Sequence, residues 1–214
     1  MVRTREPEAS RADRNAIQHS SRLRLLLQLS GLVLLAAGLA LGIWFFLWTV
    51  HPALLPQEAY YDIIANRRVT ERLVDPALVK LEQWEILGEE RAVLFVHPAL
   101  SGSTALVFPV KIEPATTFRA DLAVAPEAWT LEGDGLTFSL YVENNAGMQL
   151  VRSSYLDPKH HQQDRRWVPL QVDLSSFGGE LVRLILVVGS GPAGDQRYDW
   201  AGWGEPRLER PTWP

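Results

Sequence analysis

Residues 133–147 read GDGLTFSLYVENNAG, and this stretch decides the class of fold. Large apolar residues occupy every second position (Leu136, Phe138, Leu140, Val142), with polar or amphipathic residues between them, which is the period of a half-buried β-strand. Glycine and aspartate before the strand, and Asn-Asn-Ala-Gly after it, are turn signals. The stretch therefore predicts a strand that ends in a hairpin.

The same pattern recurs on both sides of this strand. Further strands are expected at 92–97, 103–112, 117–125, 148–156, 167–174, 181–188 and 198–208. Pro109 removes a backbone donor, so its half of the second segment is expected at an edge or a bulge. Turn signals separate about eight strands, and no helical pattern lies between them. The prediction is a mainly β protein, an antiparallel two-sheet sandwich of jelly-roll type.

The segment before the first of these strands is less regular. Residues 57–74 are compatible with a helix, with Tyr60, Ile63 and Ile64 on one side, and residues 78–86 are compatible with a short strand or a loop. We therefore expect a linker and a lead-in helix at 51–90, followed by the sandwich domain at 91–214.

A different signal stands at 25–50, which reads LLLQLSGLVLLAAGLALGIWFFLWTV and contains no charged residue. As a helix it is long enough to cross a hydrocarbon core of about 30 Å. Residues 1–24 carry six arginines against three acidic residues and are expected to be a disordered cytoplasmic tail. The prediction is one transmembrane α-helix, with its N-terminus inside and the C-terminal domain outside the cytoplasmic (inner) membrane of a bacterium.

A cleaved signal peptide is the alternative interpretation of this segment. The charged region is long, the apolar run exceeds the 7–15 residues of a signal-peptide core, and no small-x-small site follows Val50. These features favour an uncleaved anchor in contact with membrane lipid. Gly31, Gly38 and Gly42 share one helix face, and the last two form a GxxxG pattern, which predicts packing against a partner membrane helix.

The charge distribution excludes one class of function. The net charge of the chain is −4, and residues 25–214 carry 15 basic against 22 acidic residues without a basic stripe. No nucleic-acid partner is therefore expected. The absence of cysteine excludes disulfides and thiolate ligands.

No catalytic set is recognisable, and we predict that the protein is not an enzyme. The serines lack the G-x-S-x-G frame, and the histidines lack the spacing of a metal site. No catalytic residue and no metal ligand is assigned.

Two segments near the C-terminus resemble a known family. They are WVPLQVDLSSFGG at 167–179, which leads into the apolar run 181–188, and DWAGWGEP at 199–206. Together with Pro126–Trp129 and the segment 133–138, they resemble the galactose-binding-like jelly rolls, which include carbohydrate-binding modules of bacterial enzymes and cell-envelope proteins. The resemblance covers about residues 91–208.

The resemblance implies a non-catalytic module that binds sugars or mediates protein contacts. Aromatic faces can stack on sugars, so Trp129, Trp167, Trp200 and Trp203 are the candidate ligand-binding residues. Such modules often carry a structural Ca²⁺, toward which Asp134, Asp173, Asp195 and Asp199 could contribute; no other cofactor is expected.

The leading hypothesis is a membrane-anchored extracytoplasmic binding module that docks a cell-surface glycan or a partner protein. The alternative is a structural accessory subunit of a larger membrane protein complex, assembled through the glycine-bearing helix. An exposed aromatic residue beside convergent polar groups would favour the first hypothesis.

Overall fold

The computed structural model describes residues 33–46, 55–67, 71–72, 76–100 and 102–212. The chain divides into two compact units, Met1–Leu54 and Leu55–Pro214. In the first unit, residues 33–46 form an α-helix. The second unit contains all the strands described below.

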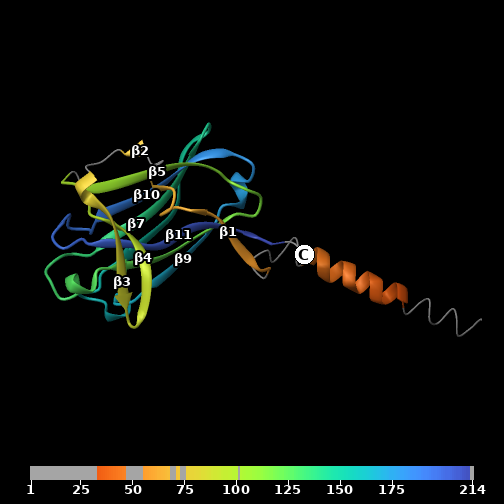
Figure 1. The fold of residues 1–214 in the computed structure, drawn as a ribbon, viewed down its shortest axis with the longest axis horizontal. Helices are drawn as coiled ribbons and strands as arrows, with labels where there is room; N and C mark the ends of the chain where they lie inside the picture. Colours follow the sequence, from red (N-terminus) through yellow and green to blue (C-terminus); the bar gives the residue numbers. More distant parts are fainter. Residues whose placement is uncertain (1–32, 47–54, 68–70, 73–75, 101, 213–214) are drawn as a thin grey trace, which may run out of the picture. The chain divides into compact units, whose positions relative to one another are not determined.

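Two antiparallel sheets make up the second unit, and Figure 1 shows their strands in two layers. Sheet A contains β1 (Gln57–Asp62), β3 (Val79–Ile86), β4 (Glu89–Val96), β6 (Thr117–Val124), β9 (Val168–Asp173) and β11 (Ala201–Pro211). Sheet B contains β2 (Glu71–Arg72), β5 (Ser103–Lys111), β7 (Leu136–Asn144), β8 (Gly147–Leu156) and β10 (Leu181–Ser190). Short 3₁₀ turns are η3 (Pro76–Leu78), η4 (Pro126–Ala128), η5 (Gln162–Asp164) and η6 (Ser175–Phe177).

The strand order is β3-β4-β11-β6-β9 in sheet A and β2-β5-β10-β7-β8 in sheet B. From β4 to β11 the chain changes sheets at every connection except the β7–β8 hairpin. This arrangement matches the eight strands in two sheets of a jelly roll. The predicted mainly β, antiparallel two-sheet sandwich is confirmed.

The core lies between the sheets because each strand alternates inward and outward side chains. In β7 the inward set is the one that the sequence predicts, from Leu136 to Val142 at every second position. The hairpin follows at Asn144–Gly147, where Gly147 adopts a positive φ of 121°. Pro109 pairs with Arg183 of β10 on one side. On its other side the register of β2 leads to residues 68–70, which lie outside the described residues, so the expected edge position stays a prediction.

The predicted lead-in helix at 57–74 is wrong. Residues 57–62 form β1, which pairs with β11 from Gln57↔Pro211 to Asp62↔Arg207. This pairing satisfies backbone groups along one side of β1, and Ile63, which follows it, is buried in the core. The compact unit therefore begins at Leu55 rather than at residue 91, and the ambiguous segment 78–86 contributes strand β3.

The predicted transmembrane span at 25–50 extends beyond the described residues at both ends, and Gly31 lies outside them. Within the part of the chain that the structure describes, no helix is long and apolar enough to cross a membrane.

Candidate functional site

The outer face of sheet A has a hollow, and the central strands carry small residues on the same face. In β11, Ala201 and Trp203 point into the core, so Gly202 and Gly204 face outward. The neighbouring strand β6 places Ala123 on the same face, paired with Gly202. These small residues leave space that large side chains from β3 and β4 partly fill.

Trp84 of β3 lies directly over Gly202. A Cβ atom at Gly202 would come 2.8 Å from Cη2 of Trp84, so the indole reaches this position only because the residue beneath it is glycine. Trp84 Nε1 donates a hydrogen bond to Glu82 Oε2 at 2.8 Å. The indole also stacks on Trp167, with 6.4 Å between ring centroids and 26° between planes, and Trp167 covers Gly204 in the same way.

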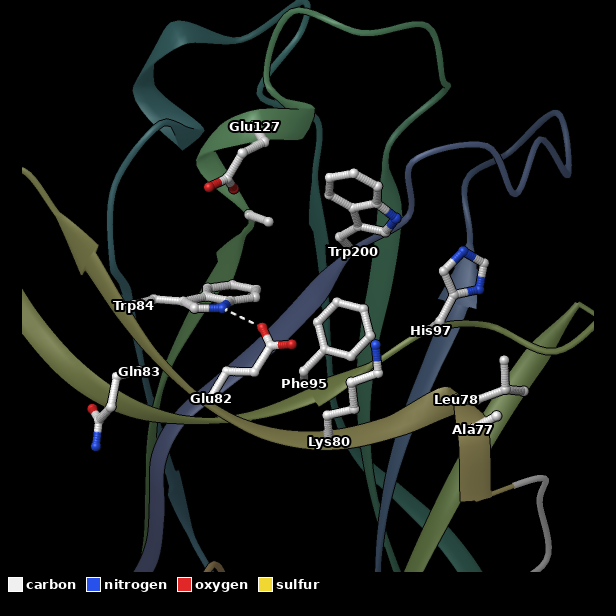
Figure 2. Close-up of a pocket in the computed structure, with 11 residues that line it drawn as sticks. Ala77, Leu78, Lys80, Glu82, Gln83, Trp84, Phe95, His97, Glu127 and Trp200 are labelled. Carbon is white, nitrogen blue, oxygen red and sulfur yellow. Dashed lines mark hydrogen bonds between the residues drawn. The ribbon is translucent and has the colours of Figure 1, made fainter.

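Phe95 and Trp200 complete an aromatic floor around the same hollow. The Phe95 ring meets Trp84 edge to face, with centroids 6.2 Å apart. Trp200 immediately precedes β11, and its carbonyl oxygen accepts a hydrogen bond from Ala125 N–H at 2.9 Å. Its ring meets Tyr198 edge to face at 5.9 Å. Figure 2 shows the rings of Trp84, Phe95 and Trp200 around this space.

The hollow is an open groove of about 840 Å³, within the size range of ligand pockets. We call it the aromatic groove. Besides the three rings it is lined by Ala77, Leu78, Lys80, Glu82, Gln83, His97, Ala125 and Glu127. An apolar floor with a few polar groups at its rim is the usual composition of a small-molecule site.

Several polar side chains of the aromatic groove are held by neighbouring protein groups. The Lys80 ammonium lies 5.7 Å above the Phe95 ring centroid, and Glu82 accepts the hydrogen bond from Trp84. His97 Nδ1 donates to the Pro98 carbonyl oxygen at 2.7 Å. Glu127, on η4, makes no side-chain hydrogen bond or ion pair with any residue that the structure describes. The groove therefore offers positioned acceptors and donors to a ligand.

The structure separates the four tryptophans that the sequence suggested as ligand residues. Trp200 lines the aromatic groove, and Trp167 supports it from below as a buried residue. Trp129 is half-buried and donates through Nε1 to the Val124 carbonyl oxygen at 2.8 Å. Trp203 is 0% exposed, between the sheets, so the expectation of a ligand platform does not extend to it.

Sequence reasoning missed Trp84 and Phe95. Both lie in segments whose partner strands cannot be assigned from the sequence, and Trp84 falls in the segment 78–86 that the sequence left open. One sequence signal could have indicated the groove: in segment 201–204, Gly202 and Gly204 flank Trp203, so one face of this strand carries no side chain. Small residues on one face of a strand indicate that something large approaches that face.

The carboxylates suggested for Ca²⁺ have different surroundings in the structure. Asp195 is paired with Arg197 at 2.6 Å, and Asp173 accepts from the Ser175 backbone N–H at 2.8 Å. Within the described ranges, no group of three or more histidine or acidic side chains is arranged to hold a metal ion. A structural Ca²⁺ therefore stays a prediction.

Asp199 has a different role, as a buried acid beside the groove residue Trp200. It is 2% exposed, and its Oδ2 has no hydrogen-bond partner among the residues described. Burial, together with the negative charges of Asp134 and Asp195, raises the pKa of Asp199 to about 7. The protonated form is therefore favoured over a wide acidic range.

Comparison with known proteins gives one sequence relative. No family model matches the chain. A protein from Archaeoglobus fulgidus, described as uncharacterized, is 38% identical over 127 residues, which cover 58% of this chain and 32% of the relative. The chain thus matches about a third of the length of that relative.

Similar solved structures include several carbohydrate-binding modules. The CBM51-2 and INT domains of Clostridium perfringens ZmpB give a TM-score of 0.45 at 12% identity, over 66% of this chain and 28% of that one. CBM51 from Clostridium perfringens GH95, in complex with methyl-galactose, gives a TM-score of 0.42 at 15% identity, over 72% of this chain and 92% of that one. TmCBM61 in complex with β-1,4-galactotriose gives a TM-score of 0.36 at 17% identity, over 72% of this chain and 88% of that one. With identities and TM-scores this low, the ligands of those modules say nothing about the ligand of this chain.

Proposed function

We propose that the protein is a non-catalytic binding module that docks a glycan in the aromatic groove. The observation that carries the proposal is the floor formed by Trp84, Phe95 and Trp200, with charged and amide groups at its rim. Sugar rings present apolar C–H faces that stack on aromatic rings, and their hydroxyl groups pair with rim donors and acceptors. The open shape of the groove suits an extended ligand rather than a fully enclosed one.

A glycan array probed with the full-length chain tests this function. The protein is kept in a polyoxyethylene detergent, because sugar-headed detergents would compete for the groove. Glycans that bind are then titrated against Trp200→Ala, which removes one half-buried ring of the floor. The matched control is Tyr141→Ala, which removes a half-buried ring from β7 of sheet B.

We expect Trp200→Ala to weaken glycan binding by about tenfold or more, since aromatic anchors dominate the affinity of well-packed sites. Tyr141→Ala should leave binding unchanged. Absence of any glycan ligand, or equal losses in the two variants, would refute the proposal.

We further propose that residues 25–50 anchor this module in the cytoplasmic membrane of a bacterium, with the N-terminus inside. The uncharged sequence supports this, as do the exposed apolar side chains of helix 33–46, among them Leu34, Leu35 and Leu41. Arg22 and Arg24 support the orientation. Because the chain has no cysteine, Ser10→Cys and Glu132→Cys each introduce one thiol for labelling. In intact cells an impermeant maleimide should label only the second; labelling of the first instead would reverse the orientation.

A second candidate function is that of an accessory subunit in a membrane protein complex. Gly38 and Gly42 carry no neighbouring atom within 4 Å of where a Cβ would lie, so a partner helix has room to approach them. Gly38→Leu with Gly42→Leu should abolish association in an in-membrane assay. Ala40→Leu, on the opposite helix face, is the matched control and should have no effect. Unchanged association in the glycine variants would exclude this route of assembly.

A further inference from the structure

Two carboxylates lie at one end of the aromatic groove without a cation to balance them. Glu82 extends from β3 and Glu127 from η4, and both line the groove. In Figure 2 both carboxylates lie on the Trp84 side. Neither forms an ion pair with any residue within the described ranges. A neutral ligand bound over these two carboxylates would displace their water and supply no positive charge, so its binding would cost free energy.

Lys80 also lines the groove, but within the described ranges no ion pair joins its ammonium to either carboxylate. Lys80 and Glu82 project from the same face of β3, only one pleat apart, so an ion pair between them is sterically accessible. Lys80 instead places its ammonium over Phe95, while Glu82 accepts from Trp84 Nε1. Glu82 Oε2 is therefore held at the edge of the indole, and no lysine or arginine that the structure describes pairs with it.

The Trp84 indole lines the same end of the groove and is only 8% exposed, so the attraction for positive charge comes from the two carboxylates. A protonated amine also supplies three N–H donors and a positive charge to the carboxylates at this end. A neutral hydroxyl group supplies one donor and no charge.

We infer that the aromatic groove selects saccharides that carry a free, protonated amino group, with the amine bound between Glu82, Glu127 and Trp84. The ligand class is thus an amino sugar that is not N-acetylated. This inference rests on the proposed glycan-binding function and names the class of glycan that the same site takes.

Matched oligosaccharides test the inference on the full-length chain in polyoxyethylene detergent. Glucosamine oligomers, N-acetylglucosamine oligomers and glucose oligomers share a β-1,4-linked backbone and differ at the 2-position. They are titrated calorimetrically at about pH 6, where the free amine is protonated. We expect the glucosamine oligomer to bind about tenfold more tightly than the other two, as two partly exposed charge pairs of ~0.7 kcal/mol each would give.

Charge-removing variants place the selectivity in the groove. Glu127→Gln and Glu82→Gln should each reduce the preference for glucosamine by about threefold, because each keeps an acceptor oxygen but loses its charge. Glu90→Gln, on an exposed residue of β4 outside the groove, is the matched control and should leave the preference unchanged. Equal binding of the three oligomers would overturn the inference while leaving glycan binding intact. Binding of none of them, with no other array ligand, would overturn the proposed function itself.

Discussion

A tryptophan packs on each face of β11, and the two have different roles. On the inner face, Trp203 packs edge-on against Phe118 and Phe138, with ring centroids 6.2 Å and 5.1 Å apart. On the outer face, β11 carries Gly202 and Gly204, and Trp84 approaches from β3 to lie over Gly202. The same side chain is thus a core residue on one face and part of a ligand floor on the other. What distinguishes the two is the size of the neighbouring residues, rather than the tryptophan itself.

The largest effect is expected on the inner face. Trp203→Ala removes a fully buried indole and should lower the free energy of unfolding by about 3–5 kcal/mol. Urea denaturation followed by far-UV circular dichroism measures this loss. Trp203→Phe is the informative partner, because the buried Nε1 of Trp203 has no hydrogen-bond partner among the described residues. A phenylalanine should therefore cost much less, and equal losses would contradict a packing role.

The next largest effect is expected from Asp199, in the loop before β11. Asp199 has a pKa of about 7 in the folded protein against 3.8 for the free side chain. Between these pH values the folded state holds the extra proton. The stability from this group is therefore complete below about pH 4 and is lost as the pH rises to about 7, by roughly 2–4 kcal/mol in total. Urea midpoints measured from pH 4 to pH 8 report this loss.

Asp199→Asn is the control for the pH dependence, since it replaces the acid with a neutral side chain of the same shape. The variant should have a flatter stability profile and should exceed the wild type at pH 8. Asp195 acts at the other end of the scale, because Arg197 lowers its pKa to about 2 and its contribution is lost only as the pH falls. Parallel profiles for the wild type and Asp199→Asn would show that Asp199 is not the group that titrates.

The sequence predicted the inner face better than the outer one, for a physical reason. In a half-buried strand such as β7, apolar residues recur at every second position, so the sequence itself shows which side chains face the core. Segment 57–62 has no such alternation. Its state is decided by β11, where Arg210 binds Glu58 across 152 residues of sequence. A helix-compatible pattern was therefore overruled by a distant partner strand.

The groove was hidden for a related reason. Trp200 could be suggested as a ligand residue from the sequence, but the site exists only because the register pairs Gly202 with Phe95 and brings Trp84 over the glycine. Strand register depends on pairs that are far apart in the chain, and no local pattern reports it. Composition alone could not distinguish Trp203 from Trp200.

A third prediction fills the outer hollow directly. Gly202→Ala places a Cβ where Trp84 now lies, so the indole must move. We expect a loss of about 1–3 kcal/mol in stability and a clear loss of glycan affinity. Gly189→Ala, in β10 of sheet B, is the matched control, because its Cβ would meet Gly102 O at an ordinary 3.6 Å. If both variants lose the same stability and neither loses affinity, Gly202 has no special role in the groove.

The smallest expected effect concerns the support beneath the groove. The Arg91 guanidinium lies 5.4 Å from the Trp167 ring centroid and pairs with Glu89 at 2.7 Å. Arg91→Gln should cost about 0.5–1 kcal/mol in stability, because both contacts are partly exposed. Arg91→Lys keeps the charge but loses the planar group that covers the indole. Its stability should therefore lie between those of the wild type and Arg91→Gln. A double-mutant cycle with Trp167→Leu isolates the contact between the two side chains. A coupling energy near zero would mean that Trp84 and Gly204 position Trp167 without help from Arg91, so that the outer face, like the inner one, depends on packing alone.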